Sequence, residues 1–319
     1  MELYELSALL WAIGVFSAAA LSLGGALSTR LDILAHFAPL YLLGGLIAIA
    51  LQIVRGAARG RWAVGMGAGA MLVATALMAP DVVAGLTAPM SPPARQTLKI
   101  VQLNLWSKNV DPKATAAWIA RQNADAVVLE EVIDGPSIVP FYLLRAYPYR
   151  APGPVRFDTT TMILSKTRPV DAGAYPSPDT FGRHSGAWAT FGHGADAYTV
   201  VGTHAPWPAP PGLQQSLSGL LATRLRAFDR DSLILAGDFN ATPWSFSLRR
   251  QDAQLGLNRR THAMFSWSAR PYSRYKVWTP VPLMPIDHVY AGNAWKTVSV
   301  ETGPKLGSDH LPIVVVLTR

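Results

Sequence analysis

Two short motifs place acidic, amide and imidazole side chains at the ends of apolar runs. In LILAGDFNATP an apolar stretch leads into Asp238 and Asn240, and in GSDHLPIVVVL Asp309 and His310 directly precede another. Side chains two residues apart on a strand project from the same face, so Asp238 and Asn240 can reach one site and hold a water molecule or a metal there. His310 suits proton transfer, because the pKa of histidine lies near neutrality and a neighbouring carboxylate can fix its tautomer. Each motif alone is also typical of a turn, where Asp and Asn are favoured.

Four further apolar runs end in residues of the same kinds. They are VVLEEV with Glu130 and Glu131, PIDHVY with Asp287 and His288, KIVQLNLW with Asn104, and VVGTHAPW with His204. Hard divalent cations, Mg²⁺ above all, take few protein carboxylates and keep positions for water and phosphate oxygens. This set of residues therefore fits such an ion. The chain has no cysteine, so thiolate catalysis and cysteine metal sites are excluded.

The elements that would position these residues are short β-prone runs separated by helical stretches. Strands are predicted at residues 98–105, 126–129, 160–165, 187–191, 198–203, 232–236, 286–290 and 313–317, and helices at 112–122 and 213–228. This alternation predicts one mixed α/β domain over residues 97–319.

The motifs follow one another in the order Asn104, Glu131, His204, Asp238 with Asn240, Asp287, and Asp309 with His310. This ordered set resembles the endonuclease/exonuclease/phosphatase superfamily, which has a DNase I-like fold. The resemblance spans roughly residues 98–317. It implies a four-layered α/β sandwich, in which two packed mixed β-sheets are flanked by helices.

The resemblance also implies a role for each residue of the set. Glu131 falls on the metal-binding glutamate, with Asn104 beside it, and Glu130 occupies the place of a glutamine. His204 would contact the phosphate or the leaving group, and Asp238 with Asn240 would position the attacking water. Asp287 would orient the catalytic imidazole of His310, and Asp309 would supply a further metal contact. No family role falls on His288.

One residue departs from the pattern, since several nucleases of the superfamily have Asp two residues after the first Asn, where this chain has Trp106. Trp106 and Trp207, in the loop at residues 205–212, could stack on a base, enter a membrane interface or simply pack the loops. A segment at residues 244–278 mixes basic and aromatic side chains and could contact substrate or belong to the core. Its members are Arg249, Arg250, Arg259, Arg260, Arg270, Arg274 and Lys276, with Trp244, Phe246, Phe265, Trp267, Tyr272, Tyr275 and Trp278.

The N-terminal third has a different composition. Apolar runs at residues 6–27, 33–54 and 62–79 each approach the length that crosses about 30 Å of hydrocarbon. A cleaved signal peptide is the alternative for the first, but it lacks a basic start and two more runs follow. We therefore expect a membrane domain of three transmembrane helices at residues 1–81, a linker at 82–96 and a catalytic domain at 97–319. The glycines at 24–25 and 65–69 would let helices approach closely.

Charge bears on topology and on ligands. Acidic and basic residues number four each before Arg95, so the net charge of +8 lies wholly from Arg95 onward, where it favours anionic ligands without choosing between lipid head groups and nucleic acid. The second connection holds Arg55, Arg59 and Arg61, and the first holds only Arg30. Arg95 and Lys99 follow the third run and count against the orientation that these numbers favour. By the positive-inside tendency we expect a multi-pass inner-membrane protein with an extracytoplasmic catalytic domain.

Together these features predict a membrane-anchored phosphodiester hydrolase that uses Mg²⁺, with Mn²⁺ or Ca²⁺ as alternatives. Water would attack with His310 as general base and the metal on Glu131. The preferred substrate is a lipid or a lipid-linked phosphodiester, and a DNA or RNA nuclease is the alternative. A catalytically dead, membrane-anchored binding protein is the rival from a different class.

Overall fold

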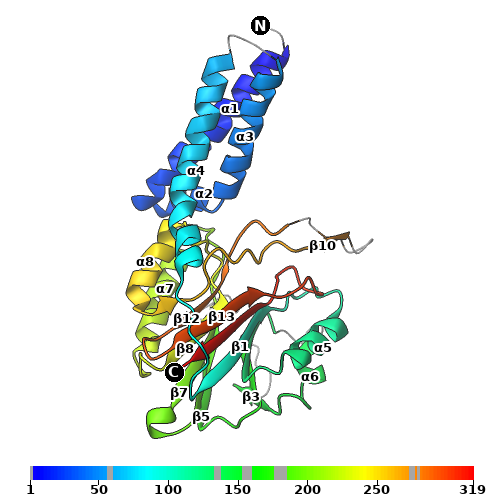
Figure 1. The fold of residues 1–319 in the computed structure, drawn as a ribbon, viewed down its shortest axis with the longest axis vertical. Coiled ribbons are helices and arrows are strands. Elements are labelled where there is room, and N and C mark those ends of the chain that lie inside the picture. Colours follow the sequence, from blue (N-terminus) through cyan, green and yellow to red (C-terminus); the bar gives the residue numbers. More distant parts are fainter. Residues whose placement is uncertain are drawn as a thin grey trace.

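The computed structural model describes residues 3–55, 60–132, 138–152, 160–175, 185–272, 277–278 and 281–319. It consists of a helical column on top of an α/β sandwich, with the N-terminus at the far end of the column (Figure 1). The column contains α1 (Leu3–Ser22), the 3-10 helix η1 (Leu23–Ala26), α2 (Thr29–Ala35), α3 (Ala38–Arg55) and α4 (Arg61–Thr87).

The sandwich contains two six-stranded sheets with helices outside them. The first sheet has the order β13 (Lys296–Thr302), β14 (Ile313–Thr318), β1 (Thr97–Asn104), β2 (Ala126–Glu130), β4 (Met162–Ser165) and β3 (Tyr149–Ala151). The second has the order β5 (Asp171–Tyr175), β6 (Gly186–Phe191), β7 (Tyr198–His204), β8 (Leu233–Asp238), β12 (Asp287–Ala291) and β9 (Asn258–Arg259). The remaining elements are α5 (Pro112–Gln122), α6 (Val139–Tyr142), η3 (Gly194–Asp196), α7 (Leu213–Leu225), α8 (Phe246–Leu255) and the hairpin of β10 (Pro271–Tyr272) and β11 (Val277–Trp278).

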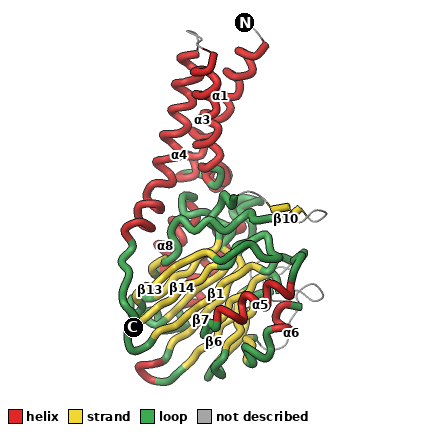
Figure 2. Tube along the Cα trace, turned by 45° about the vertical axis from the view of Figure 1, so that its right-hand side comes forward, coloured by secondary structure: helices red, strands yellow, loops and turns green. Residues whose placement is uncertain are grey.

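Three apolar clusters separate the four layers. The central cluster joins the two sheets through side chains such as Ile100 and Val128 from one and Val200 and Ile234 from the other. A second cluster packs α5 against the outer face of the first sheet, and a third packs α7 and α8 against the second. Figure 2 shows α5 and α6 on the outer side of the strands. The predicted sandwich of two mixed sheets is therefore confirmed, since β1 pairs parallel with β2, β7 parallel with β8, and the other neighbours antiparallel.

Local sequence explains where the helices begin and end. Asp111 accepts a hydrogen bond from the N–H of Ala114 at the start of α5, and the helix stops at Asn123, which adopts the left-handed conformation. Ser245 caps α8 in the same way through the N–H of Leu248, and Gly256 ends that helix at a φ of 58°.

Two helices of the column, Leu6–Ala26 and Arg61–Thr87, are long and apolar enough to cross a membrane. The bent pair Thr29–Ala35 and Ala38–Ile53, which turns by 58°, gives a third if it is one span. Gly45 and Gly67 let α3 and α4 meet, because a Cβ on Gly45 would lie 2.5 Å from the Gly67 carbonyl oxygen. Helix α4 continues past Asp81 to Thr87, so the first part of the segment predicted as a linker is helical.

Two buried acids of the column connect it to the sandwich. The Asp32 carboxylate accepts hydrogen bonds from the N–H groups of Phe246 and Ser247, each at 2.7 Å, at the first turn of α8. The Asp81 carboxylate contacts Arg259 Nη1 at 2.7 Å, His262 Nδ1 at 2.9 Å and the N–H of Ala263 at 2.7 Å. A buried carboxylate is stable only when it is paired in this way, so these contacts fix the column at a defined position on the sandwich.

Candidate active site

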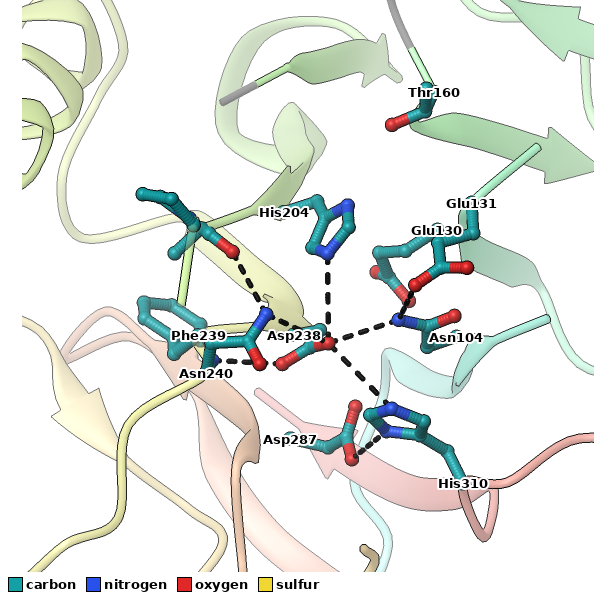
Figure 3. Close-up of polar contacts among 12 residues, drawn as sticks. Asn104, Glu130, Glu131, Thr160, His204, Asp238, Phe239, Asn240, Asp287 and His310 are labelled. Carbon is teal, nitrogen blue, oxygen red and sulfur yellow. Dashed lines mark hydrogen bonds and ion pairs between the residues drawn. The ribbon is translucent and has the colours of Figure 1, made fainter. Parts of the chain in front are cut away.

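Strand ends bring the polar residues of the sequence motifs to one edge of the sandwich. Because β1 and β2 are parallel, as are β7 and β8, their carboxyl ends lie together, and Asp287 at the start of β12 pairs with Asp238 at the end of β8. Figure 3 shows seven of these residues converging, namely Asn104, Glu131, His204, Asp238, Asn240, Asp287 and His310. All eight predicted residues lie in this constellation, namely Asn104, Glu131, His204, Asp238, Asn240, Asp287, Asp309 and His310.

Asp238 lies at the centre of the constellation. Its Oδ2 is 2.9 Å from Asn104 Nδ2, 3.7 Å from His204 Nε2 and 3.8 Å from His310 Nε2. Its Oδ1 accepts the backbone N–H of Asn240 at 2.8 Å. The preceding Gly237 permits this geometry, since a Cβ there would lie 1.9 Å from the carbonyl oxygen of residue 203. Two imidazoles thus approach one buried carboxylate oxygen.

His310 and Asp287 form a tightly bonded pair. His310 Nδ1 lies 2.8 Å from Asp287 Oδ2, which also accepts the Ser266 hydroxyl at 2.5 Å, while Gln102 Nε2 donates to Oδ1 at 2.8 Å. A carboxylate with three donors keeps its position and its charge. The Nδ1–H of His310 therefore faces Asp287, and Nε2 faces Asp238.

His204 and Asn240 close the other side of the site. Asn240 adopts the left-handed conformation at a φ of 47°, and its Nδ2 donates to the Ala205 carbonyl at 2.9 Å and contacts Asp238 Oδ2 at 3.3 Å. Burial lowers the pKa of His204, so its ring is neutral at neutral pH.

Oxygen ligands for a metal lie beside Asp238. Glu131, at a φ of 53°, accepts hydrogen bonds from Asn104 Nδ2 at 3.2 Å and from the N–H of Ser107 at 2.9 Å. Asp309 Oδ1 lies 3.9 Å from His310 Nε2. Asn104 presents its amide nitrogen to both carboxylates, while its oxygen accepts the Trp106 N–H at 2.9 Å, so a role as metal ligand requires the amide to rotate.

The charge balance of the site fits a divalent cation. Burial raises the pKa of Asp238 to about 7 and also raises the pKa of Asp309. The positive charge of the neighbouring side chains therefore does not compensate for the burial of these two carboxylates. Asp238, Asp287 and His310 also form a group whose possible ligand atoms lie within 4.8 Å of one another. Since His310 and Asp287 already bond to each other, the carboxylate oxygens of Glu131, Asp238 and Asp309 are the donors that remain for a hard cation.

The same carboxylates govern His310. Burial alone would lower the pKa of His310, but Asp287, Asp238 and Asp309 outweigh it and raise this pKa to about 10. The ring is therefore protonated at neutral pH while the acidic charge is uncompensated. For His310 to accept a proton, as the sequence predicts, positive charge must first enter the site and lower this pKa.

Glu130 does not face the metal ligands. It is fully buried, and its Oε2 accepts Gln102 Nε2 at 2.9 Å. Burial, followed by the negative charges of Asp287 and Asp238, raises the pKa of Glu130 well above its usual range, which favours its neutral, protonated form. A neutral acid both donates and accepts, as an amide does, which explains how Glu can occupy the place that the superfamily gives to Gln.

Sequence reasoning missed the residues that support the site. Gln102 stands two residues before Asn104 in an apolar strand, and this spacing could have indicated that both face the same side. The Ser308 hydroxyl donates to the Asn104 carbonyl at 2.6 Å, and the indole N–H of Trp267 donates to Asp309 Oδ2 at 3.3 Å. Ser266 had no local signal, because it lies in an irregular segment whose path depends on tertiary contacts, and Trp267 was noted only as a member of the basic and aromatic segment.

His288, Trp207 and Trp106 each contact other protein groups. The fully buried ring of His288 lies between the Ala241 carbonyl, 2.9 Å from Nε2, and the Thr261 hydroxyl, 3.3 Å from Nδ1. Trp207 is half exposed and packs edge-on against Trp267 with ring centroids 5.4 Å apart. Trp106 lies under the Arg270 guanidinium, 5.9 Å from its ring centroid.

Much of the basic and aromatic segment contacts the helical column and not a substrate. Arg249 donates to the Leu77 carbonyl at 2.8 Å, Arg250 lies 3.7 Å from Asp32, and Trp244 is fully buried among residues of the column. Phe246 and Phe265 pack against the same cluster. Arg260 donates to the carbonyls of Gly292 and Trp295 within the sandwich. For these residues the structure supports the second alternative of the sequence analysis, because their charges and rings make contacts within the protein.

Among the members that the structure describes, Arg270 borders the site together with Trp267. Its half-exposed guanidinium lies 3.4 Å from Asp309 Oδ2. Tyr272 and Trp278 are described only as backbone of the short hairpin, and Arg274, Tyr275 and Lys276 lie outside the described residues. Among the arginines used to predict topology, Arg59 and the side chain of Arg55 also lie outside them.

Comparison with known proteins gives a family and a fold. The model of the Endonuclease/Exonuclease/phosphatase family matches residues 101–310. A comparison with curated protein sequences finds no significant match.

Three solved structures share the architecture of the sandwich. Sphingomyelinase C from Streptomyces griseocarneus has a TM-score of 0.53 at 19% identity and covers 70% of this chain and 100% of its own. Beta toxin from Staphylococcus aureus with bound magnesium ions has a TM-score of 0.54 at 15% identity, with 70% and 100% covered. TDP2 from D. rerio, complexed with a single-strand DNA product, has a TM-score of 0.53 at 14% identity, again with 70% and 100% covered.

Proposed function

Because the chain belongs to the Endonuclease/Exonuclease/phosphatase family, we propose that it is a metal-dependent phosphodiester hydrolase held at a membrane surface by its N-terminal helices. The observation that carries this proposal is the approach of His204 Nε2 and His310 Nε2 to one carboxylate oxygen of Asp238, within 3.7 and 3.8 Å. Such a cluster can hold a water molecule and the phosphoryl oxygens of an ester in one place.

Each residue of the site has a part in hydrolysis by water. His310 accepts the proton of the attacking water at Nε2, while Asp287 holds its Nδ1–H and stabilises the imidazolium that forms. Asp238 and Asn240 position the water and the phosphoryl group. Neutral His204 hydrogen-bonds to a phosphoryl oxygen or to the leaving group. Catalysis then comes from positioning and from charge stabilisation by preorganised groups.

Glu131, with Asp309 and a rotated Asn104 amide, would hold a divalent cation, for which Mg²⁺ is the first choice and Mn²⁺ or Ca²⁺ are alternatives. The bound cation supplies positive charge that stabilises the phosphoryl oxygens and lowers the pKa of His310. The magnesium ions of the structurally similar beta toxin support this choice.

The test is hydrolysis of bis(p-nitrophenyl) phosphate by the purified full-length protein with Mg²⁺. We expect release of p-nitrophenolate that EDTA and the His310→Ala substitution each abolish. Full activity after either treatment would contradict the mechanism. If the chain were a binding protein without catalysis, neither hydrolysis nor metal binding by calorimetry would be seen.

The column supports an extracytoplasmic catalytic domain. If three spans cross the membrane, the start of α1, the end of α3 and the start of α4 lie on one side and the sandwich on the other, as Figure 1 shows for the two ends of the column. Arg61 begins α4 at the end away from the sandwich, where the positive-inside tendency favours the cytoplasm. The division into residues 1–81, 82–96 and 97–319 remains part of this proposal.

The substrate class follows from the same arrangement. The column brings the site close to a bilayer, and most of the described basic residues of the segment at 244–278 are paired within the protein. Both features favour a lipid or lipid-linked phosphodiester. The exposed Arg270 above Trp106 is the feature that suits nucleic acid. Parallel incubation with phospholipids, sphingomyelin and DNA separates the two, and rapid DNA cleavage without lipid turnover would reverse the preference.

A further inference from the structure

An apolar pocket of about 200 Å³ lies where the helical column meets the active site. One wall comes from the end of α2 and the turn before α3, with Ile33 and Phe37. The opposite wall comes from the sandwich, with Trp207, Trp267 and Met284. The predicted membrane segment and the catalytic domain therefore build this pocket together.

The pocket is continuous with the catalytic residues. Asn240, which bonds to Asp238, is one of its lining residues. The ring of Trp267 lines the pocket while its indole N–H donates to Asp309 at 3.3 Å. A group bound in the pocket could therefore be part of the same molecule as a phosphate held at Asp238 and Asp309.

Exposed apolar side chains surround the opening of the pocket. Phe37 and Trp207 line it and are still about one-third and one-half exposed, at 36% and 53%. Leu40 on α3 and Leu283 beside Met284 are exposed as well. Aromatic and aliphatic side chains at the end of a membrane helix are typical of the interface between hydrocarbon and head groups.

We propose that this pocket binds the hydrocarbon chain of a lipid phosphoester and so positions its phosphate at Asp238. The proposal rests on the proposed function and specifies its substrate class. A nucleobase fits the pocket poorly, because a base edge carries several donors and acceptors and the lining offers few. The Nδ2 of Asn240 is already bonded to Ala205 and Asp238, and the buried Nε2 of His36, which has no partner, is a single ring nitrogen. The volume lies below the roughly 300–1,000 Å³ typical of sites for drug-sized ligands, so one segment of a single chain fits.

The proposal predicts selectivity for chain length on a constant reacting group. Methyl p-nitrophenyl phosphate and hexyl p-nitrophenyl phosphate have the same scissile bond and leaving group and differ only in the alkyl chain. Each methylene buried in an apolar site favours binding about fourfold. If two methylenes enter the pocket, kcat/KM for the hexyl ester should exceed that for the methyl ester by at least about tenfold.

Two substitutions that fill the pocket from opposite walls test its role in full-length protein held in lipid nanodiscs. Ile33→Trp and Met284→Trp should each lower the ratio of hexyl to methyl kcat/KM towards one. The control is Leu72→Trp, which adds the same ring to an exposed position on α4, and it should leave the ratio unchanged. A wild-type ratio near one, or a ratio that neither pocket substitution changes, would overturn the proposal.

A binding experiment separates failure of the pocket from failure of the hydrolase function. A hexyl phosphate with a diazirine at the chain end is photolysed with the protein, and the labelled residues are mapped by mass spectrometry. Labels on Trp207, Trp267 or Met284 that Ile33→Trp removes support the pocket, even if neither ester is hydrolysed. Labels confined to the outer surface of the column refute it, even if both esters are hydrolysed.

Discussion

The pair of Asp287 and His310 gives a direct test of how the site is held together. In Asp287→Asn the amide offers one oxygen and one NH₂ group to three donors that now point at the carboxylate, from His310, Ser266 and Gln102. At least one donor must lose its acceptor, and one amide N–H must face another donor. If the amide nitrogen faces His310, the imidazole is misoriented or forced into the other tautomer. If the nitrogen faces Gln102 instead, His310 keeps its position but bonds to a neutral oxygen in place of a charged carboxylate.

The expected loss follows from the contacts removed. A hydrogen bond to a charged group contributes about 1.5–3 kcal/mol, which corresponds to a fall in rate of about 10–150-fold. Because Asp287 is fully buried beneath His310, the loss should appear in kcat while KM stays within about threefold. Ser266→Ala removes one neutral donor and keeps the carboxylate, so its effect should be smaller, about 2–10-fold.

The assay is the steady-state hydrolysis of bis(p-nitrophenyl) phosphate with Mg²⁺, with circular dichroism to show that each variant is folded. Asp231→Asn is the matched control, because Asp231 is exposed and contacts Asn293 away from the site. A folded Asp287→Asn variant with kcat within twofold of the wild type would refute the view that His310 depends on this carboxylate.

Three further predictions concern stability, metal and topology. Burial, with a smaller contribution from Arg259, lowers the pKa of His288 to about 3. The unfolded chain, where this pKa is about 6.5, therefore binds a proton more readily than the folded protein. The neutral ring contributes its full stability above a pH of about 6.5, and the free energy of unfolding falls by up to about 1.4 kcal/mol per pH unit as the pH drops from there towards 3. Thermal unfolding between pH 7.5 and 5 should show this loss, and a His288→Gln variant with an unchanged acid dependence would contradict it. Glu131→Gln should raise the Mg²⁺ concentration for half-maximal activity at least about tenfold, and an unchanged titration would remove Glu131 from the metal site. Since the chain has no cysteine, Ser216→Cys on the exposed side of α7 gives a single thiol, which a membrane-impermeant maleimide should label on intact cells; labelling only after lysis would place the sandwich in the cytoplasm.

The sequence predicted the strands that carry the site because their ends combine apolar runs with polar residues. The helix predicted at residues 112–122 is α5, and the strand ends at Asn104, His204 and Asp238 lie within a residue or two of their predicted positions. Short-range pattern suffices there, since each strand is an almost continuous buried apolar run that ends at a polar residue.

Features that depend on tertiary contacts could not be predicted in this way. Helix α8 has a mostly polar sequence, and its first turn is fixed by Asp32, more than 200 residues away in the chain. Asp32 and Asp81 read as isolated charges in apolar runs, and only the fold shows that they bond to the sandwich. For the same reason the arginines at 249, 250 and 259 resembled a ligand-binding surface, although their partners lie in the helical column or beside it.

The contacts of Asp32 and Asp81 have a practical consequence for recombinant production. A fragment beginning at Thr97 would retain every strand of the sandwich, yet it would leave the first N–H groups of α8 without acceptors and Arg259 with Asp252 as its remaining carboxylate partner. It would also expose the ring of Trp244, which the column covers completely. Such a fragment should expose an apolar surface with unpaired polar groups and aggregate during purification. The protein is therefore best handled at full length in detergent or nanodiscs, where the contacts between the helical column and the sandwich are kept.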